Sequence, residues 1–183
     1  MQYKRLLSIL VSSLLLSSCS ATRDMSCSAN WLLMGALGNV NCNQAEGASF
    51  AKVEQVPEGY SVIYVYRPYS VVNGSADPDI YVNGKLYGEL KNRGYFPVLT
   101  NESAVTIRID KEGTFNQWDV PAKTITLYPK PGKTYYLRLE VVVLSLSVTG
   151  PIVNGEKDLK LSVYDENEAP IDIGDTRLVK MNL

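Results

Sequence analysis

The most informative absence from the sequence is histidine, of which its 183 residues contain none. Without an imidazole the chain cannot build a Ser-His-Asp or Cys-His catalytic centre, and it cannot bind zinc or haem through histidine. Cysteine is scarce as well, with three residues, Cys19, Cys27 and Cys42. The histidine-dependent hydrolases are therefore excluded, and neither a cofactor nor a metal is expected.

Long apolar runs are absent after the N-terminus. The most hydrophobic later run, Val141 to Val148, has eight residues, which suits a buried strand and is too short to cross a membrane. An excess of basic residues is missing too. Once residues 1–18 are removed, 16 basic side chains remain against 19 acidic ones, a net charge of about −3. This balance argues against a nucleic-acid surface.

Residues 1–18 are typical of a secretory signal peptide. Lys4 and Arg5 form its basic start, and the apolar run from Leu6 to Leu16 is too short to span a bilayer. The segment ends in Leu16-Ser17-Ser18-Cys19, which resembles the lipobox of bacterial lipoproteins. The resemblance implies a thioether-linked diacylglycerol on Cys19 and a further, amide-linked acyl chain such as palmitate. Several acyl chains anchor a soluble domain stably, at ~0.8 kcal/mol per buried methylene group.

The residue after the lipobox cysteine is Ser20. Lipoproteins kept at the inner membrane of Gram-negative bacteria typically carry Asp at this position, so the resemblance favours the outer membrane, with the protein facing the periplasm. The alternative is plain secretion, with Cys19 in a disulfide.

Cys27 and Cys42 remain as a pair in an oxidising compartment, and we expect them to form a disulfide. The loop between them contains the apolar segment Trp31–Gly38. That segment either folds back onto the main domain or forms an exposed apolar knob for a protein partner. A metal site here is disfavoured, because two thiolates without histidine would need carboxylate ligands at an unsuitable spacing.

From about Val53 the pattern becomes that of a β-protein, with short β-branched and aromatic runs between turn signals. Asn83-Gly84 separates two such runs and is a strong hairpin signal, because both residues tolerate the positive φ of a type I′ turn. Alternation of Val105, Ile107 and Ile109 with polar residues predicts a half-buried strand. The expected strands are Ser61–Tyr66, Asp79–Val82, Lys85–Leu90, Ser103–Asp110, Lys123–Tyr128, Thr134–Val148, Lys157–Tyr164 and a short Arg177–Lys180.

These seven or eight strands predict an all-β fold, an antiparallel β-sandwich of the immunoglobulin or transthyretin type. A small closed barrel is the alternative. The expected organisation is a signal peptide at 1–18, a tether with the cysteine loop at 19–52, and the β-sandwich domain at 53–183.

Several short motifs of the β-region form a recognisable series: Tyr60–Pro68, Ile80–Lys85, Gly88–Asn92, Gly94–Phe96 and Arg177–Val179. This series resembles that of a family of uncharacterised bacterial lipoproteins, catalogued as a domain of unknown function. The resemblance covers about residues 57–183 and implies a compact all-β domain on a lipid tether, with no catalytic residue to carry over.

Two short motifs resemble parts of catalytic or phosphate-binding sites, but the rest of each site is missing from the sequence. Ser49-Phe50-Ala51-Lys52 has the Ser-x-x-Lys spacing of penicillin-interacting enzymes, but the Ser-Asp-Asn and Lys-Thr-Gly partner motifs are missing. Gly132-Lys133-Thr134 looks like the end of a phosphate-binding loop, yet the first glycine of that motif is replaced by Leu127.

An acidic cluster near the C-terminus is interpreted as a solvated loop, with a weak ion site as the alternative. A hydrolase acting on cell-wall glycan could use two carboxylates without histidine, and it is the rival hypothesis of function. The cluster comprises Asp165, Glu166, Glu168, Asp172 and Asp175.

Tyrosines concentrate in the first third of the β-region, around one arginine. Such rings could form a surface that stacks on sugars or clamps an extended peptide. The alternative is that they are cross-strand aromatic pairs stabilising the sheet, with Arg67 stacked on a ring. The candidate binding surface consists of Tyr64, Tyr66, Arg67, Tyr69, Tyr81 and Tyr95.

The sequence thus predicts a lipid-anchored, non-catalytic protein of the bacterial cell envelope. The expected partners are the membrane, through the lipid on Cys19, and an envelope protein or peptidoglycan, through the β-domain.

Overall fold

The computed structural model describes residues 44–74, 76–111, 118–149, 152–168 and 170–182. The lipobox cysteine Cys19, the expected Cys27–Cys42 disulfide and the apolar segment Trp31–Gly38 lie outside these residues. Within them, no helix has both the length and the apolar character needed to cross a membrane.

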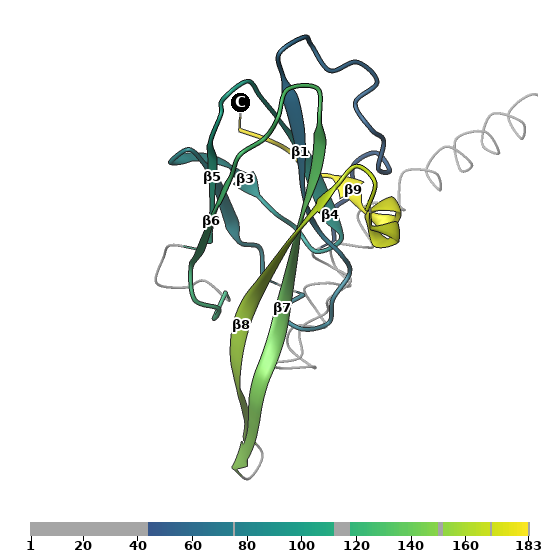
Figure 1. Ribbon diagram of the computed structural model, residues 1–183. Helices are drawn as coiled ribbons and strands as arrows, with labels where there is room; N and C mark the ends of the chain where they lie inside the picture. The colour runs from purple at the N-terminus through teal and green to yellow at the C-terminus, as the bar shows by residue number, and fades with distance from the viewer. Residues whose placement is uncertain (1–43, 75, 112–117, 150–151, 169, 183) are drawn as a thin grey trace, which may run out of the picture. The chain divides into compact units, whose positions relative to one another are not determined.

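The described chain folds into two β-sheets (Figure 1). A five-stranded sheet has the order β8-β7-β1-β4-β9, and a four-stranded sheet has the order β3-β2-β5-β6. A short 3-10 helix, η3 (Ile171–Asp175), precedes β9. The strands are β1 (Ser61–Arg67), β2 (Asp79–Val82), β3 (Lys85–Glu89), β4 (Gly94–Thr100), β5 (Val105–Asp110), β6 (Lys123–Leu127), β7 (Thr134–Thr149), β8 (Ile152–Asp165) and β9 (Arg177–Leu178).

The main core lies between the two sheets, as in a sandwich. Ile63 and Val65 of β1 pack in one buried cluster with Ile107 and Ile109 of β5. Burial of such side chains stabilises the fold by roughly 1.5–3 kcal/mol each. The outer face of the five-stranded sheet carries a second buried cluster, which contains Val62, Tyr64, Tyr66, Tyr95, Tyr136 and Ile173.

The local sequence predictions for the four-stranded sheet are confirmed. Asn83 and Gly84 have φ values of 49° and 79°, as a type I′ hairpin turn between β2 and β3 requires. In β5, Val105, Ile107 and Ile109 are buried and the intervening residues are half-buried. The strict alternation therefore identified both the strand and its inward face.

Strand β4 is an addition to the predicted set, which brings the described strands to nine. It contains Pro97, which is disfavoured in the interior of a sheet because it has no N–H to donate. Among the described residues, β4 pairs with β1 along its whole length and otherwise with β9 alone, at Gly94 and Tyr95. At Pro97 the outer edge of β4 faces no described strand. The missing N–H of Pro97 therefore costs no hydrogen bond on that side.

The predicted all-β sandwich is confirmed, with one correction: its sheets are not wholly antiparallel. β1 pairs in parallel with β7, and β4 in parallel with β9. The physical reason is the path of the chain: after β4 it passes through β5 and β6 of the other sheet and returns as β7 in the direction of β1.

Strand β8 begins earlier than predicted. Asn154-Gly155 resembles a turn, but both residues lie within β8, where Asn154 pairs with Ser147 and Gly155 with Leu146. The tertiary pairing of two long strands overrides the local turn preference, and the last pair of the ladder is Thr149 with Ile152.

Candidate functional site

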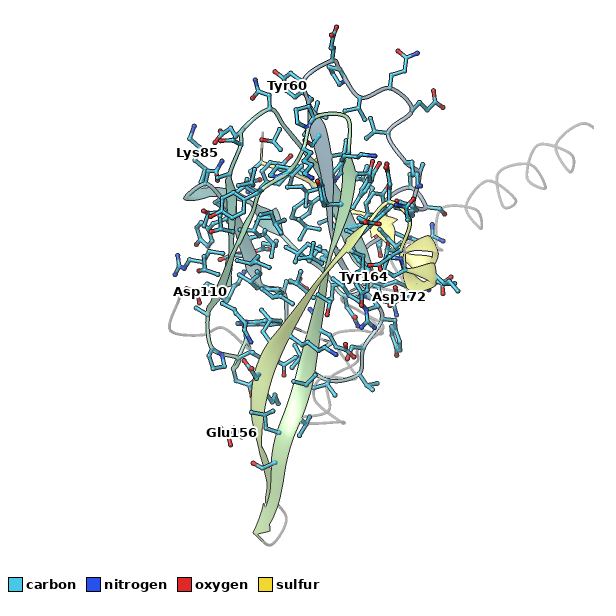
Figure 2. All side chains as sticks on the ribbon, in the orientation of Figure 1. Tyr60, Lys85, Asp110, Glu156, Tyr164 and Asp172 are labelled. Atoms are coloured by element: carbon cyan, nitrogen blue, oxygen red, sulfur yellow. The ribbon has the colours of Figure 1, made fainter. Side chains whose placement is uncertain are left out.

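The longest feature of the five-stranded sheet is an arm formed by β7 and β8. β1 pairs with β7 only from Thr134 to Arg138, and within the described chain β7 pairs past Arg138 with β8 alone. We call residues 141–149 and 152–158 the arm. Figure 1 shows it running beyond the other strands, and Figure 2 places Glu156 on it, away from Tyr60 and Lys85.

The arm is uncharged over most of its length. From Val141 to Gly155 the sequence contains no Asp, Glu, Lys or Arg. The ladder shifts register between Val143 and Ser145, so Leu144 is the extra residue of a β-bulge. Val143 and Leu144 are 39% and 59% exposed. The bulge therefore carries two adjacent apolar side chains that are exposed to solvent.

The bulge also shifts the pairing of the two strands. Before it, Val141 pairs with Leu159 and Val143 with Lys157. After it, Ser145 pairs with Glu156, so Leu144 is left out of the ladder.

A polar cluster fixes the base of the arm. Lys157 Nζ lies 2.7 Å from Asp119 Oδ2 and 2.7 Å from Asn73 Oδ1. Asn73 also donates to Asp119 Oδ1 at 2.8 Å. Partial burial alone would raise the pKa of Asp119, but hydrogen bonds from Lys157 and Asn73 bring that pKa below its ordinary value. The cluster joins three separate segments where the arm leaves the sandwich.

A second lysine protects the edge of β8 nearby. Lys123 Nζ contacts Asp158 Oδ2 at 3.1 Å and the Leu159 carbonyl oxygen at 2.5 Å. An edge carbonyl that already accepts from an ammonium group is unavailable to a further strand. Near its base the edge of β8 is therefore blocked by a charged side chain.

Arg67 organises the loop between β1 and β2. The side chain is 2% exposed, and its guanidinium donates to the carbonyl oxygens of Ala76 and Asn73, both at 2.6 Å. Its terminal carbon lies 5.5 Å from the centroid of the Trp118 ring. Burial lowers the pKa of Arg67 to about 10, although the nearby Asp77 opposes this shift. Arg67 is thus a structural residue of the loop.

The outer face of the five-stranded sheet holds stacked tyrosines, which we call the tyrosine face (Tyr64, Tyr95 and Tyr136). Tyr64 and Tyr136 are opposite each other on β1 and β7, with ring centroids 5.5 Å apart in a stacked arrangement. Phe50 packs edge-on against Tyr64 at 5.2 Å and against Tyr95 at 5.1 Å. Such edge-on contacts are the favoured geometry of aromatic pairs.

The segment that carries Phe50, residues 47–54, is called the strap here. Its Ala51 and Val53 amides donate to the hydroxyl oxygens of Tyr95 and Tyr64, at 3.4 Å and 2.5 Å. Main-chain bonds join Phe50 N to the Thr176 carbonyl at 3.0 Å and the Ala48 carbonyl to Leu178 N at 2.8 Å. Residues assigned to the tether from the sequence therefore pack on the sheet.

The six residues of the candidate binding surface do not lie together. Four of them, Tyr64, Tyr66, Arg67 and Tyr95, are at most 4% exposed. Tyr69, in the loop after β1, is 50% exposed. Tyr81 belongs to the four-stranded sheet, where the Arg108 guanidinium lies 5.0 Å from its ring centroid.

The prediction of one tyrosine surface is therefore corrected. The side chains of β1 are buried on both faces, because the strap, η3 and Tyr164 of β8 cover the face opposite the core. The cross-strand aromatic pairing and the stacked Arg67, which were the alternative interpretation, describe the observed arrangement.

Comparison with known proteins assigns a family. Residues 57–152 match the family model described as a protein of unknown function, DUF2846. The chain belongs to the DUF2846 family. No curated protein and no solved structure matches the chain. The DUF2846 match spans β1 to β7 and ends at the first residue of β8.

Two acidic side chains that follow the matched part of the DUF2846 domain make separate contacts with it. Glu166 contacts Lys133, and Asp172 accepts from Tyr66 and Arg138. In the described ranges no group of three or more Asp, Glu, Cys or His side chains could hold a metal ion. Two of the five acids of the C-terminal cluster, Glu166 and Asp172, are therefore held in separate contacts.

Two carboxylates of the DUF2846 domain contact the same ammonium group. Asp79 and Glu89 are opposite each other on β2 and β3, and both contact Lys111 Nζ, at 3.0 Å and 2.6 Å. A glycosidase of the kind considered above needs space for a sugar between its two carboxyl groups. Here the ammonium group of Lys111 occupies that position.

Sequence reasoning missed the residues that fix the arm and the strap. Asn73, Asp119 and Lys157 look like ordinary surface residues, and Phe50 lies in a segment without strand periodicity. A signal was present for the arm itself: the uncharged run from Val141 to Gly155, which is long for one buried strand.

Proposed function

We propose that this protein is a lipid-anchored protein of the bacterial cell envelope whose β-domain binds a partner without catalysing a reaction. The arm is the surface that it presents. The observation that carries this proposal is the exposure of Val143 and Leu144 in a run without charge, on strands that extend past their sheet. The lipobox at Cys19 supplies the anchor.

The chemistry of the arm favours an envelope protein over peptidoglycan. Exposed aliphatic side chains gain free energy when they leave water, at roughly 25 cal/mol per Å² of buried apolar surface. A hydrated glycan offers few apolar groups for such a contact, whereas a protein surface does. Deep insertion into lipid is disfavoured, because a two-stranded arm has unpaired edge groups that hydrocarbon cannot satisfy.

The arm is also placed for recognition. Lys157, Asp119 and Asn73 fix its base, so its orientation is set before a partner arrives. Preorganisation of this kind lowers the entropy cost of association. The blocked edge of β8 at Leu159 directs a partner toward the distal arm and away from the base.

Site-specific photo-crosslinking in intact cells tests this proposal. A crosslinking amino acid at Leu144 should yield one discrete adduct with an envelope protein, and the same amino acid at Thr124 should not. Thr124 is the matched control because it is an exposed strand residue on β6 of the other sheet. Equal adducts at the two positions, or none at Leu144, would contradict a binding role for the arm.

A further inference from the structure

The strap is bound to the sheet as a peptide ligand is bound, by main-chain contacts and one aromatic anchor. Its backbone bonds run to the chain around β9, and Ser49 forms an isolated antiparallel bridge with Arg177. The amides of Ala51 and Val53, two residues apart, donate to tyrosine hydroxyls. Alternate amides along one edge are the pattern of an extended peptide.

Two side chains of the strap also contact the tyrosine face. Phe50 packs edge-on against the rings of both Tyr64 and Tyr95. Two residues later, the Lys52 ammonium lies 5.9 Å from the centroid of the Tyr136 ring, in a cation–π contact. The tyrosine face therefore contacts four successive residues of the strap. It contacts the ring of Phe50, the amide of Ala51, the ammonium group of Lys52 and the amide of Val53.

The strap does not use all that the tyrosine face offers. The hydroxyls of Tyr64 and Tyr95 accept from the strap, and each phenol keeps a proton of its own that it can donate. The Tyr136 hydroxyl is buried and has no hydrogen-bond partner among the described residues. A buried hydroxyl without a partner costs roughly 1–3 kcal/mol. A peptide whose carbonyl reached this hydroxyl would remove that cost.

The second half of the strap is exposed to solvent, although Phe50 anchors its first half. Residues 51–55 are all exposed, and two main-chain bonds join the strap to the segment around β9. The strap connects to β1 through a turn in which Gly59 has a φ of 83°. Exposed segments with few buried contacts open at low free-energy cost.

We propose that the tyrosine face is a binding site for an extended peptide segment of a partner protein, and that the strap occupies this site in its absence. The partner segment carries an aromatic residue followed by any residue except proline, then Lys or Arg, then any residue except proline. Proline is excluded because the amides at those two positions donate to Tyr95 and Tyr64. This site is separate from the arm and does not depend on its function.

A substitution in the full chain can loosen the strap without touching the tyrosines. A Cβ at Gly47 would overlap the carbonyl oxygen of Leu178, so Gly47→Ala forces the start of the strap away from β9. Phe50→Ala is a second variant, which removes the anchor instead. Near-ultraviolet circular dichroism and the urea midpoint verify that each variant stays folded.

The probe is a synthetic, fluorescently labelled peptide with the sequence of residues 46–56, measured by fluorescence anisotropy. We expect it to bind the Gly47→Ala and Phe50→Ala chains at least about tenfold more tightly than the wild type, because a ligand binds in proportion to the fraction of open sites. Peptides carrying Phe50→Ala or Ala51→Pro are the matched controls, and both should lose binding. Tyr64→Phe in the Gly47→Ala chain should weaken binding, because it removes an acceptor and keeps the ring.

Equal affinity for the wild type and the loosened variants would overturn the proposal, as would equal affinity of the native and control peptides. The Gly47→Ala chain could instead form a dimer in which each strap binds the tyrosine face of the other copy. That result would assign the face to a second copy of this chain and overturn the assignment to a separate partner. Neither result would affect the crosslinking outcome expected at Leu144.

Discussion

The hydroxyl of Tyr66 donates to Asp172 Oδ1 at 3.0 Å, and this bond joins β1 to η3 across 106 residues of chain. The other carboxylate oxygen of Asp172 accepts from Arg138 Nε at 2.9 Å. Figure 2 shows Asp172 and Tyr164 on the same side of the domain, where η3 lies beside β8. One carboxylate thus attaches the C-terminal segment to two adjacent strands, β1 and β7.

Replacement of Asp172 should release η3 from the sheet. We expect Asp172→Ala to lower the free energy of unfolding by about 1–3 kcal/mol, since it leaves a buried hydroxyl without an acceptor. Asp172→Asn should cost less, because its amide oxygen still accepts from Tyr66. Urea denaturation measures both. Asp175→Ala, on the exposed side of η3, is the control and should change stability little; equal losses at positions 172 and 175 would contradict the anchoring role.

Stability should fall at alkaline pH. Burial raises the pKa of Tyr64, Tyr66 and Tyr87 above the ordinary value of 10.0. Above about pH 10 the unfolded chain releases these phenol protons and the folded chain keeps them, so the unfolded state becomes relatively more stable as pH rises.

Urea midpoints between about pH 8 and about pH 11 measure this dependence. Tyr66→Phe should make the decrease shallower, because one of the raised pKa values is gone. Leu99→Ala, at an exposed position that does not ionise, should keep the wild-type slope. A Tyr66→Phe slope as steep as that of the wild type would be evidence against the account.

The fold needs a glycine at position 94. A Cβ on Gly94 would lie 2.6 Å from Val179 Cγ2 and 2.7 Å from the Lys91 carbonyl oxygen. We expect Gly94→Ala to lower the free energy of unfolding by about 1–3 kcal/mol, because overpacking forces the backbone to shift. Gly174→Ala, where a Cβ would meet no atom within 4 Å, is the matched control. Thermal or urea unfolding should separate the two variants clearly.

Local features of the fold could be predicted from the sequence, whereas contacts distant in the chain could not. The Asn83-Gly84 hairpin and the alternation of β5 depend on neighbouring residues, so both were visible. Strand β4 was missed because Pro97 argues against a strand unless the free edge is known. The start of β8 was missed because its pairing with β7 overrides the turn preference of Asn154-Gly155.

The candidate site was harder to predict for the same reason. Tyr95 reaches the strap amide of Ala51 across 44 residues, and Lys157 reaches Asn73 across 84. The tyrosine pattern indicated that aromatic residues gather on β1, but alternation alone does not reveal that a preceding segment covers their face. The proposed contact residues Val143 and Leu144 lie instead on the arm, which the sequence marked only by its missing charges.

The cluster at the base should control the motion of the arm more than the stability of the domain. Lys157→Met should change the free energy of unfolding by less than about 1 kcal/mol, as is usual for a partly exposed ion pair. It should also speed amide hydrogen exchange along β7 and β8 past Val141. Lys160→Met, at an exposed position of β8, is the control and should leave exchange unchanged.

The same cluster should respond to acid. The hydrogen bonds that lower the pKa of Asp119 stabilise the fold above its ordinary value of 3.8, and this contribution is lost as pH falls further. Amide exchange in the arm of the wild type should therefore approach that of Lys157→Met at low pH. Exchange that is slower in Lys157→Met than in the wild type at neutral pH would contradict this account.

The attachment of a lipid to Cys19 is the claim on which the envelope role depends, and mass spectrometry of the N-terminal peptide, combined with membrane fractionation, tests it most directly. The account predicts that the wild-type chain begins at Cys19, carries diacylglycerol and a further acyl chain, and sediments with the outer membrane. Cys19→Ser should carry no acyl mass and should not be cleaved before residue 19. Cleavage of both proteins at the same bond, with both still sedimenting with membranes, would contradict the account.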